Sequence, residues 1–283
     1  MLIEKNIILE RTNKKPILID VFSTQNGNHR PIVVFCHGYK GFKDWGAWNL
    51  MAKTIAEAGF CFIKFNFSHN GGTVDNPIDF PDLEAFGNNN YTKELDDLND
   101  VINWVQSTFE DDTNVDETNI NLLGHSRGGG ITILKASEDS RVKKLITLAS
   151  VCDFGKRTAT IGDLKTWKES GVKYVLNGRT KQQMPHYYQF YEDFKANEAR
   201  LHIESAEKRL KIPHLIIHGD NDTSVLIDEA YALNKWNPVS QLEIIKNADH
   251  VFNVKQPWEK DTLSPELQIV TKSVIDFFVL KNP

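Results

Sequence analysis

The segment that decides the fold reads Ile-Asn-Leu-Leu-Gly-His-Ser-Arg-Gly-Gly-Gly over residues 120–130. Its first four residues are a short, mostly apolar run that predicts a buried strand, and residues 128–137 favour a helix. The pentapeptide between them matches G-x-S-x-G, in which a serine occupies a tight, strained turn from strand to helix. The glycines are needed because a bulky side chain two residues before or after the serine would clash with neighbouring backbone. We therefore predict that Ser126 is a nucleophile rather than an incidental serine in a glycine-rich turn.

Short apolar runs of the same kind recur on both sides of this segment. They cover residues 31–36, 60–67, 145–149, 215–217 and 242–245. Two earlier segments, 3–10 and 17–24, also predict strands, and a turn is expected at 26–28. Helical patterns fall at 48–58, 91–109, 128–137, 226–236 and 265–280. Strands that alternate with helices predict an α/β fold with a mostly parallel central sheet and helices on both faces.

Composition excludes several classes of protein. Of the 283 residues, 40% are hydrophobic, which is enough for a large core and excludes a disordered chain. The net charge of −5 gives no indication of nucleic-acid binding. No apolar run approaches the roughly 20 residues of a membrane span. The segment Met1–Lys5 has no apolar stretch of a secretory signal, so we expect a cytoplasmic protein that binds neither nucleic acid nor membrane.

The cysteines and glycines give no sign of a metal or cofactor. Cys36, Cys61 and Cys152 are odd in number and irregularly spaced, so we expect reduced core thiols rather than disulfides. The chain has no CxxC spacing for zinc, and no GxxxxGK[ST] or GxGxxG loop for phosphates. We therefore predict no metal and no cofactor. Oligomeric state has no signal in the sequence.

Four motifs, in this order, resemble those of the α/β-hydrolase superfamily of serine hydrolases. They are His37-Gly38-Tyr39, the pentapeptide at 124–128, His218-Gly219-Asp220-Asn221-Asp222 and Asp249-His250. Within this superfamily, the chain resembles the dienelactone-hydrolase and acyl-peptidase-like esterases. The resemblance implies the α/β-hydrolase fold and cleavage of a carboxylic ester or related acyl bond of a small-molecule substrate through an acyl-enzyme.

His250 is the predicted general base. The superfamily order is serine, acid, histidine, and His250 follows the last apolar run, where the family carries its histidine. An imidazole can take the serine proton and return it to the leaving group near neutral pH. His69 is the rival closest to the predicted site, but it lies too early in the chain for the usual base.

Three acids compete to orient this histidine. Asp222 lies three residues after Gly219 and so matches the Gly-x-x-Asp pattern of similar hydrolases. Asp220 directly follows the glycine and is interpreted as a turn residue, since Asp favours turns. Asp153, after the preceding strand, is a site that some family members use. We predict Asp222, which would hold the His250 tautomer and stabilise the imidazolium.

Two backbone N–H groups are expected to form an oxyanion hole. Arg127, directly after the serine, supplies one, and the helix that starts there adds a favourable positive end. By resemblance, Tyr39 supplies the second from the loop after the 31–36 strand.

Residues 153–211 interrupt the alternation of strands and helices. This stretch has no convincing strand and many aromatic residues, so we predict a helical cap at 155–211 inserted into a core formed by 1–154 and 212–283. Most of the aromatics should form the cap's own core. One or two of a cluster are expected to line the substrate pocket and to favour apolar acyl groups over free acids. The cluster is Tyr187, Tyr188, Phe190 and Tyr191.

Other functions use the same residues. An aminopeptidase or amidase would need an acidic anchor for a free amine, for which the cap offers Glu192, Asp193, Glu198 and Glu204. A C–C bond hydrolase, an acyltransferase and a non-catalytic binding protein with the same fold are further alternatives. A haloalkane dehalogenase is disfavoured because its nucleophile is an aspartate.

Overall fold

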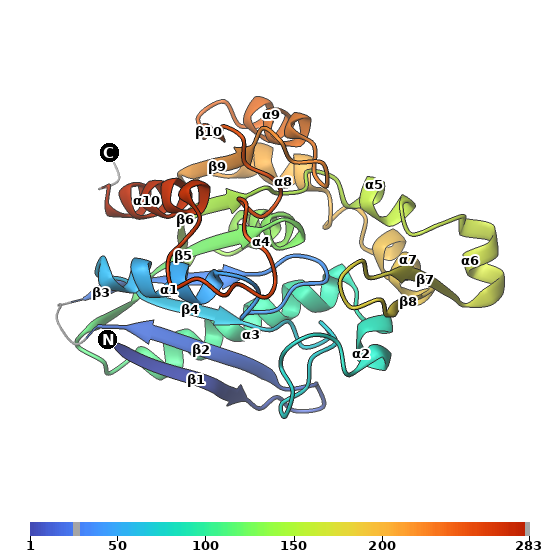
Figure 1. Ribbon diagram of the computed structural model, residues 1–283, viewed down its shortest axis with the longest axis horizontal. Coiled ribbons are helices and arrows are strands. Elements are labelled where there is room, and N and C mark those ends of the chain that lie inside the picture. The colour runs from blue at the N-terminus through green and yellow to red at the C-terminus, as the bar shows by residue number, and fades with distance from the viewer. Residues whose placement is uncertain (25–28, 281–283) are drawn as a thin grey trace.

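The computed structural model describes residues 1–24 and 29–280, so the turn expected at 26–28 lies outside the described residues. Eight strands form one sheet in the order β1-β2-β4-β3-β5-β6-β9-β10 (Figure 1). Their bounds are β1 Leu2–Leu9, β2 Ile17–Ser23, β3 Arg30–Cys36, β4 Cys61–Phe65, β5 Val115–His125, β6 Val142–Leu148, β9 His214–Gly219 and β10 Gln241–Ile245. The pairs β1–β2 and β2–β4 are antiparallel and the other five are parallel. The predicted mostly parallel α/β sheet is confirmed.

Helices cover both faces of the sheet because its central strands are apolar on both sides. In β3, Ile32 and Val34 belong to one core and Val33 and Phe35 to the other, as the strand period of two requires. The helices α1 (Trp48–Glu57) and α10 (Pro265–Val279) pack on one face. The opposite face carries α3 (Tyr91–Phe109), α4 (Arg127–Glu138), α8 (Ile203–Arg209) and α9 (Ile227–Trp236). The short α2 (Leu83–Gly87) precedes α3.

The segment between β6 and β9 differs from the predicted all-helical cap. It contains α5 (Phe154–Ala159), α6 (Leu164–Ser170), α7 (Gln189–Ala196) and α8, but also an antiparallel hairpin. The hairpin strands are β7 (Val172–Leu176) and β8 (Gln183–Tyr187). The expectation of no strand here was wrong, because each strand has only five residues and Pro185 interrupts the strand signal of β8. Figure 1 shows α5 to α7 and the hairpin together at one side of the sheet.

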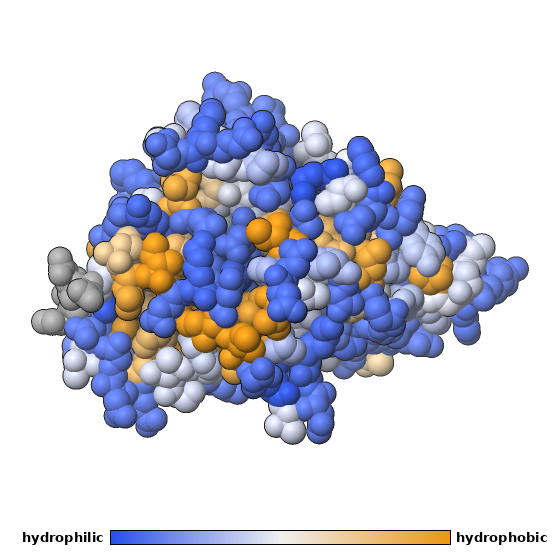
Figure 2. Space-filling view, turned by 60° about the horizontal axis from the view of Figure 1, so that its bottom comes forward, coloured by the Kyte–Doolittle hydropathy of each residue, from blue (hydrophilic) through white to orange (hydrophobic). Residues whose placement is uncertain are grey.

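The surface and the cysteines fit an ordinary globular chain. On the face seen in Figure 2, apolar areas are interrupted by polar and charged side chains, as is usual for folded proteins. Cys36, Cys61 and Cys152 are free and buried, in agreement with the sequence interpretation. Among residues 1–24 and 29–280, no helix has both the length and the apolar character to cross a bilayer.

Candidate active site

Ser126 stands on a sharp turn between β5 and α4. Its φ of 57° is in the left-handed region, which a non-glycine residue adopts only when the surroundings impose it. The glycines around it allow this turn to pack closely. A Cβ on Gly128 would lie 2.4 Å from the Cys36 carbonyl oxygen, and one on Gly124 would lie 2.5 Å from the Gly128 carbonyl oxygen. The glycine requirement read from the sequence is therefore a matter of backbone contact.

A chain of two hydrogen bonds connects Ser126 to an acid through His250. The His250 Nε2 lies 3.0 Å from the Ser126 Oγ, and its Nδ1 lies 2.7 Å from the Asp222 Oδ2. A carboxylate only accepts, so Nδ1 donates to it, which leaves Nε2 to accept the serine proton. The three predicted residues thus come together in the order serine, imidazole, carboxylate.

Asp222 is held ionised on the loop after β9. Its Oδ1 accepts the backbone N–H groups of Ser224 at 2.8 Å and Val225 at 2.9 Å. Burial alone would raise its pKa, but hydrogen bonds from His218 and His250 hold the pKa of Asp222 well below its usual range. A permanent negative charge therefore faces the His250 ring.

The rival candidates do not reach this chain of hydrogen bonds. Asp220 accepts the Asn247 N–H at 2.6 Å, as expected of a turn former. Asp153 caps α5 by accepting the Lys156 N–H at 3.0 Å. His69 contacts Ser68 instead, with 2.8 Å between its Nδ1 and the Ser68 Oγ.

The loop after β3 packs directly on the serine. A Cβ on Gly38 would lie 2.8 Å from the Ser126 Cβ. Within residues 1–24 and 29–280, neither the Tyr39 N–H nor the Arg127 N–H has a backbone carbonyl partner. Both predicted oxyanion donors are therefore available to a bound oxygen.

His125 has a role that the sequence did not reveal. Its Nε2 lies 2.9 Å from the His250 carbonyl oxygen, so it donates there and ties the turn to the loop of His250. Burial and the neighbouring His250 lower the pKa of His125 to about 3, which keeps its ring neutral. The motif could not reveal this contact, because the hydrogen-bond partner of His125 lies 125 positions further along the chain.

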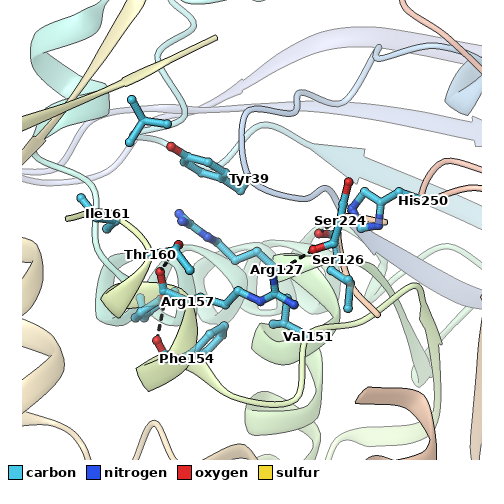
Figure 3. A pocket seen from close by; sticks show the side chains of 13 residues that line it. Tyr39, Ser126, Arg127, Val151, Phe154, Arg157, Thr160, Ile161, Ser224 and His250 are labelled. Atoms are coloured by element: carbon cyan, nitrogen blue, oxygen red, sulfur yellow. Dashed lines mark hydrogen bonds between the residues drawn. The ribbon is translucent and has the colours of Figure 1, made fainter. Parts of the chain in front are cut away.

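A cavity of about 280 Å³ lies beside Ser126 and His250, under the cap (Figure 3). It is lined by Tyr39, Tyr91, Ser126, Arg127, Val151, Phe154, Arg157, Thr160, Ile161, Val175, Ser224, Val225 and His250. Five of these, from Phe154 to Val175, come from the segment between β6 and β9. Sequence reasoning missed the side chains of Arg127 and Arg157, which enter this cavity.

The predicted aromatic cluster does not line the cavity, so that expectation is corrected. Phe190 is buried against Tyr91, with ring centroids 4.8 Å apart. Tyr188 and Tyr191 pack on Trp167, and the Tyr187 hydroxyl binds Glu84 at the surface. These rings pack in the cap's own core or contact the sheet domain, because a small cap needs large side chains to bury.

Among the described residues there is no group of three or more His, Cys, Asp or Glu side chains placed to hold a metal ion.

A comparison with family models agrees with the fold. Residues 31–182 match the model of the alpha/beta hydrolase fold family, which is more than half of the chain. The protein belongs to this family.

Relatives extend the likeness at low sequence identity. An uncharacterized 31.7 kDa protein of the traX-finO intergenic region of Escherichia coli is 29% identical over 133 residues, which is 47% of this chain and 42% of that protein. The match thus spans less than half of the relative's length.

Similar solved structures cover nearly all of the chain. Est1E from Butyrivibrio proteoclasticus has a TM-score of 0.71 and 18% identity over 98% of both chains. The esterase domain of a Rhodothermus marinus protein has a TM-score of 0.66 and 17% identity over 98% of both. Dienelactone hydrolase from Anabaena variabilis has a TM-score of 0.61 and 15% identity over 98% of this chain and 97% of that one. At these identities the likeness shows the fold.

Proposed function

We propose that this protein is a carboxylesterase-like serine hydrolase that cleaves an ester or related acyl bond through an acyl-enzyme. Ser126 attacks the acyl carbon while His250 takes its proton. His250 then gives that proton to the leaving alcohol, and Asp222 stabilises the imidazolium without becoming protonated. A water molecule, activated by the same imidazole, releases the acid and restores Ser126.

The observation that carries this proposal is the position of His250 between the two oxygens. A base must lie within hydrogen-bond reach of the proton it takes, and the 3.0 Å to the Ser126 Oγ meets that requirement. The 2.7 Å to Asp222 fixes the tautomer that leaves Nε2 free to accept.

The N–H groups of Tyr39 and Arg127 are the proposed oxyanion hole. Each donor aimed at the developing negative charge is worth about 3–4 kcal/mol of transition-state stabilisation. Their lack of backbone partners in the described part of the chain supports this assignment.

The cavity lining favours an ester over a peptide with a free amine. An ammonium group needs an acidic partner, and no acid lines this cavity within the described residues. Of the four acids considered as anchors, Glu198 and Glu204 border a separate cavity. Asp193 accepts the Thr92 hydroxyl at 2.8 Å. The guanidinium groups of Arg127 and Arg157 would instead repel an ammonium.

The similar structures point to the same substrate class. Two are an esterase domain and a dienelactone hydrolase, and Est1E is described with ferulic acid bound. A cavity of about 280 Å³ suits a small-molecule acyl group.

A fluorophosphonate probe tests the nucleophile without knowledge of the substrate. We expect one labelled site, mapped by mass spectrometry to the peptide that holds Ser126, and no label in Ser126→Ala. Ser68→Ala is the matched control, because Ser68 also contacts a histidine and an aspartate and its loss should leave labelling intact. Labelling that persists in Ser126→Ala, or a folded wild-type protein that takes no label, would refute the proposal.

A further inference from the structure

The cavity beside Ser126 carries positive charge without any acid in its lining. Arg127 and Arg157 are its charged members, apart from the titratable His250, among the residues that the structure describes. This differs from the chain as a whole, whose net charge is −5. The acids that pair with these arginines, Glu94 and Glu229, lie outside the lining.

The Arg127 guanidinium lies over two aromatic rings and makes one contact with an acid. Its guanidinium carbon lies 4.3 Å from the centroid of the Tyr39 ring and 5.3 Å from that of Tyr91. Its side-chain partner in the described chain is Glu94, with a single contact of 3.3 Å from Nη1 to Oε1. The other N–H groups of Arg127 are not sealed from solvent. Figure 3 shows this side chain extending beneath Tyr39.

Arg157 is more fully committed to the protein. Its Nη1 donates to the Ser224 carbonyl at 2.9 Å, and its Nη2 pairs with Glu229. It therefore fixes the cap to the loop of Asp222 and adds charge to the cavity, while Arg127 keeps free donors.

The charge of Arg127 shifts the pKa values of other groups around the cavity. Burial, followed by the charge of Arg127, lowers the pKa of His186 to about 3. The same two causes lower the pKa of Lys40. The positive charge of Arg127 thus acts on other ionisable groups around the cavity.

We propose that the cavity selects substrates that carry a carboxylate, and that the Arg127 guanidinium is the specificity-determining group that binds it. The guanidinium carbon lies over the Tyr39 and Tyr91 rings, one N–H group contacts Glu94, and a planar carboxylate can bind the remaining N–H groups through two parallel hydrogen bonds. The inference rests on the proposed esterase function and names its substrate class. It replaces the expectation of apolar acyl groups without free acids.

The test compares esters that differ only in the remote charge. We would use para-nitrophenyl monoesters of the linear dicarboxylic acids from succinate to suberate, each beside its ω-methyl ester. Wild-type kcat/KM should favour the carboxylate ester by about 10- to 100-fold at the best chain length, the range of a charge-assisted hydrogen bond. Added NaCl should reduce this preference.

Substitution of Arg127 should remove the preference for the carboxylate ester over the neutral ester. Arg127→Met alone would leave the buried Glu94 unpaired, so the main variant is the double change R127M/E94Q. Its kcat/KM for the carboxylate ester should fall about 10- to 100-fold further than its kcat/KM for the ω-methyl ester, so the ratio of the two approaches one. Arg127→Lys keeps the charge but loses the planar edge, and should recover only part of the preference. R200M/E138Q is the control for charge, because that pair lies at the surface.

Each outcome decides the inference. Equal rates on the two esters in the wild type, or a preference that survives in R127M/E94Q, would overturn it. An equal loss on both esters would make Arg127 a structural residue and would also overturn it. If no ester is cleaved and Ser126 takes no phosphonate, the proposed function fails. Calorimetry then measures whether free suberate binds to Ser126→Ala and whether adding R127M/E94Q abolishes that binding, which tests the anion site independently of catalysis.

Discussion

Two clusters of serine, histidine and aspartate in the described part of the chain differ in geometry. In the first, His250 stands between Ser126 and Asp222. In the second, Ser68 stands in the middle, and its hydroxyl donates to Asp97 at 3.0 Å. His69 lies 2.8 Å from the same oxygen. The proton of Ser68 is therefore held by a carboxylate, whereas that of Ser126 faces an imidazole nitrogen that can accept it.

The pKa values of the two aspartates are shifted in opposite directions. Burial is the dominant influence on Asp97 and raises its pKa, despite Arg11 and Ser68. At Asp222 hydrogen bonds outweigh burial, and the pKa is lowered. Residue type alone thus does not make a nucleophile; the order of the groups and their exposure to a cavity decide it.

Replacement of the two serines should give the largest contrast. Ser126→Ala should lower turnover of an activated ester by up to about a millionfold, because the members of such a unit act together. Ser68→Ala should leave turnover close to wild type. The measurement is kcat with para-nitrophenyl esters on protein purified free of host esterases. Wild-type-like turnover in Ser126→Ala would remove it from the mechanism.

Replacement of the two aspartates should separate turnover from stability. Asp222→Asn should reduce kcat by about ten-thousandfold, because the wrong His250 tautomer would face Ser126. Asp97→Asn should instead lower the free energy of unfolding by about 3–5 kcal/mol, since it breaks the buried pair with Arg11.

Kinetics and urea denaturation on both variants measure these effects. Asp220→Asn and Asp153→Asn are the controls for the acid, and each should cost much less activity. A larger loss in Asp153→Asn than in Asp222→Asn would mean that the orienting acid follows β6 and not β9.

An alanine at Gly38 should have an intermediate effect. The added Cβ would press on the Ser126 Cβ at 2.8 Å, so the loop of Tyr39 or the serine must move. A displacement of this size costs about a hundredfold in turnover. Gly72→Ala, near the second cluster, is the control, since its Cβ would meet Asn70 and Pro77 at 3.2 Å. If Gly38→Ala retains full kcat, the loop does not position the oxyanion donors.

The smallest expected effect is the contribution of His69 to the pH dependence of the free energy of unfolding. Burial, followed by the charges of Lys93, Lys15 and Arg11, lowers its pKa from 6.5 to about 4. The unfolded chain therefore binds a proton that the folded chain does not between these values. Stability from this group is full above pH 6.5 and is lost as the pH falls toward 4.

His69→Gln should reduce the loss of unfolding free energy between pH 7 and pH 5 by about 1 kcal/mol, allowing for partial exposure. Urea denaturation at several pH values measures it, with His29→Gln at an exposed position as the control. An unchanged slope in His69→Gln would show that His69 does not couple folding to pH.

Most of the sheet and the elbow could be predicted from the sequence because their signals are local. Buried parallel strands are short apolar runs, and the turn at Ser126 requires glycines at fixed spacing. The β7–β8 hairpin was missed because its strands have only five residues each, because Pro185 interrupts β8, and because the two strands pair only with each other in the described part of the chain.

The candidate site divides in the same way. The sequence by itself determined the fold class and singled out Ser126, Asp222 and His250, because each follows the end of a recognisable strand and such ends meet at one edge of a parallel sheet. Only the tertiary structure decided what surrounds them. Tyr188, Phe190 and Tyr191 turned into the cap core, and Arg127 and Arg157 entered the cavity, because packing between distant segments sets the direction of a side chain. Local patterns record where the backbone goes, whereas charge and shape in a cavity arise from residues that meet only after folding.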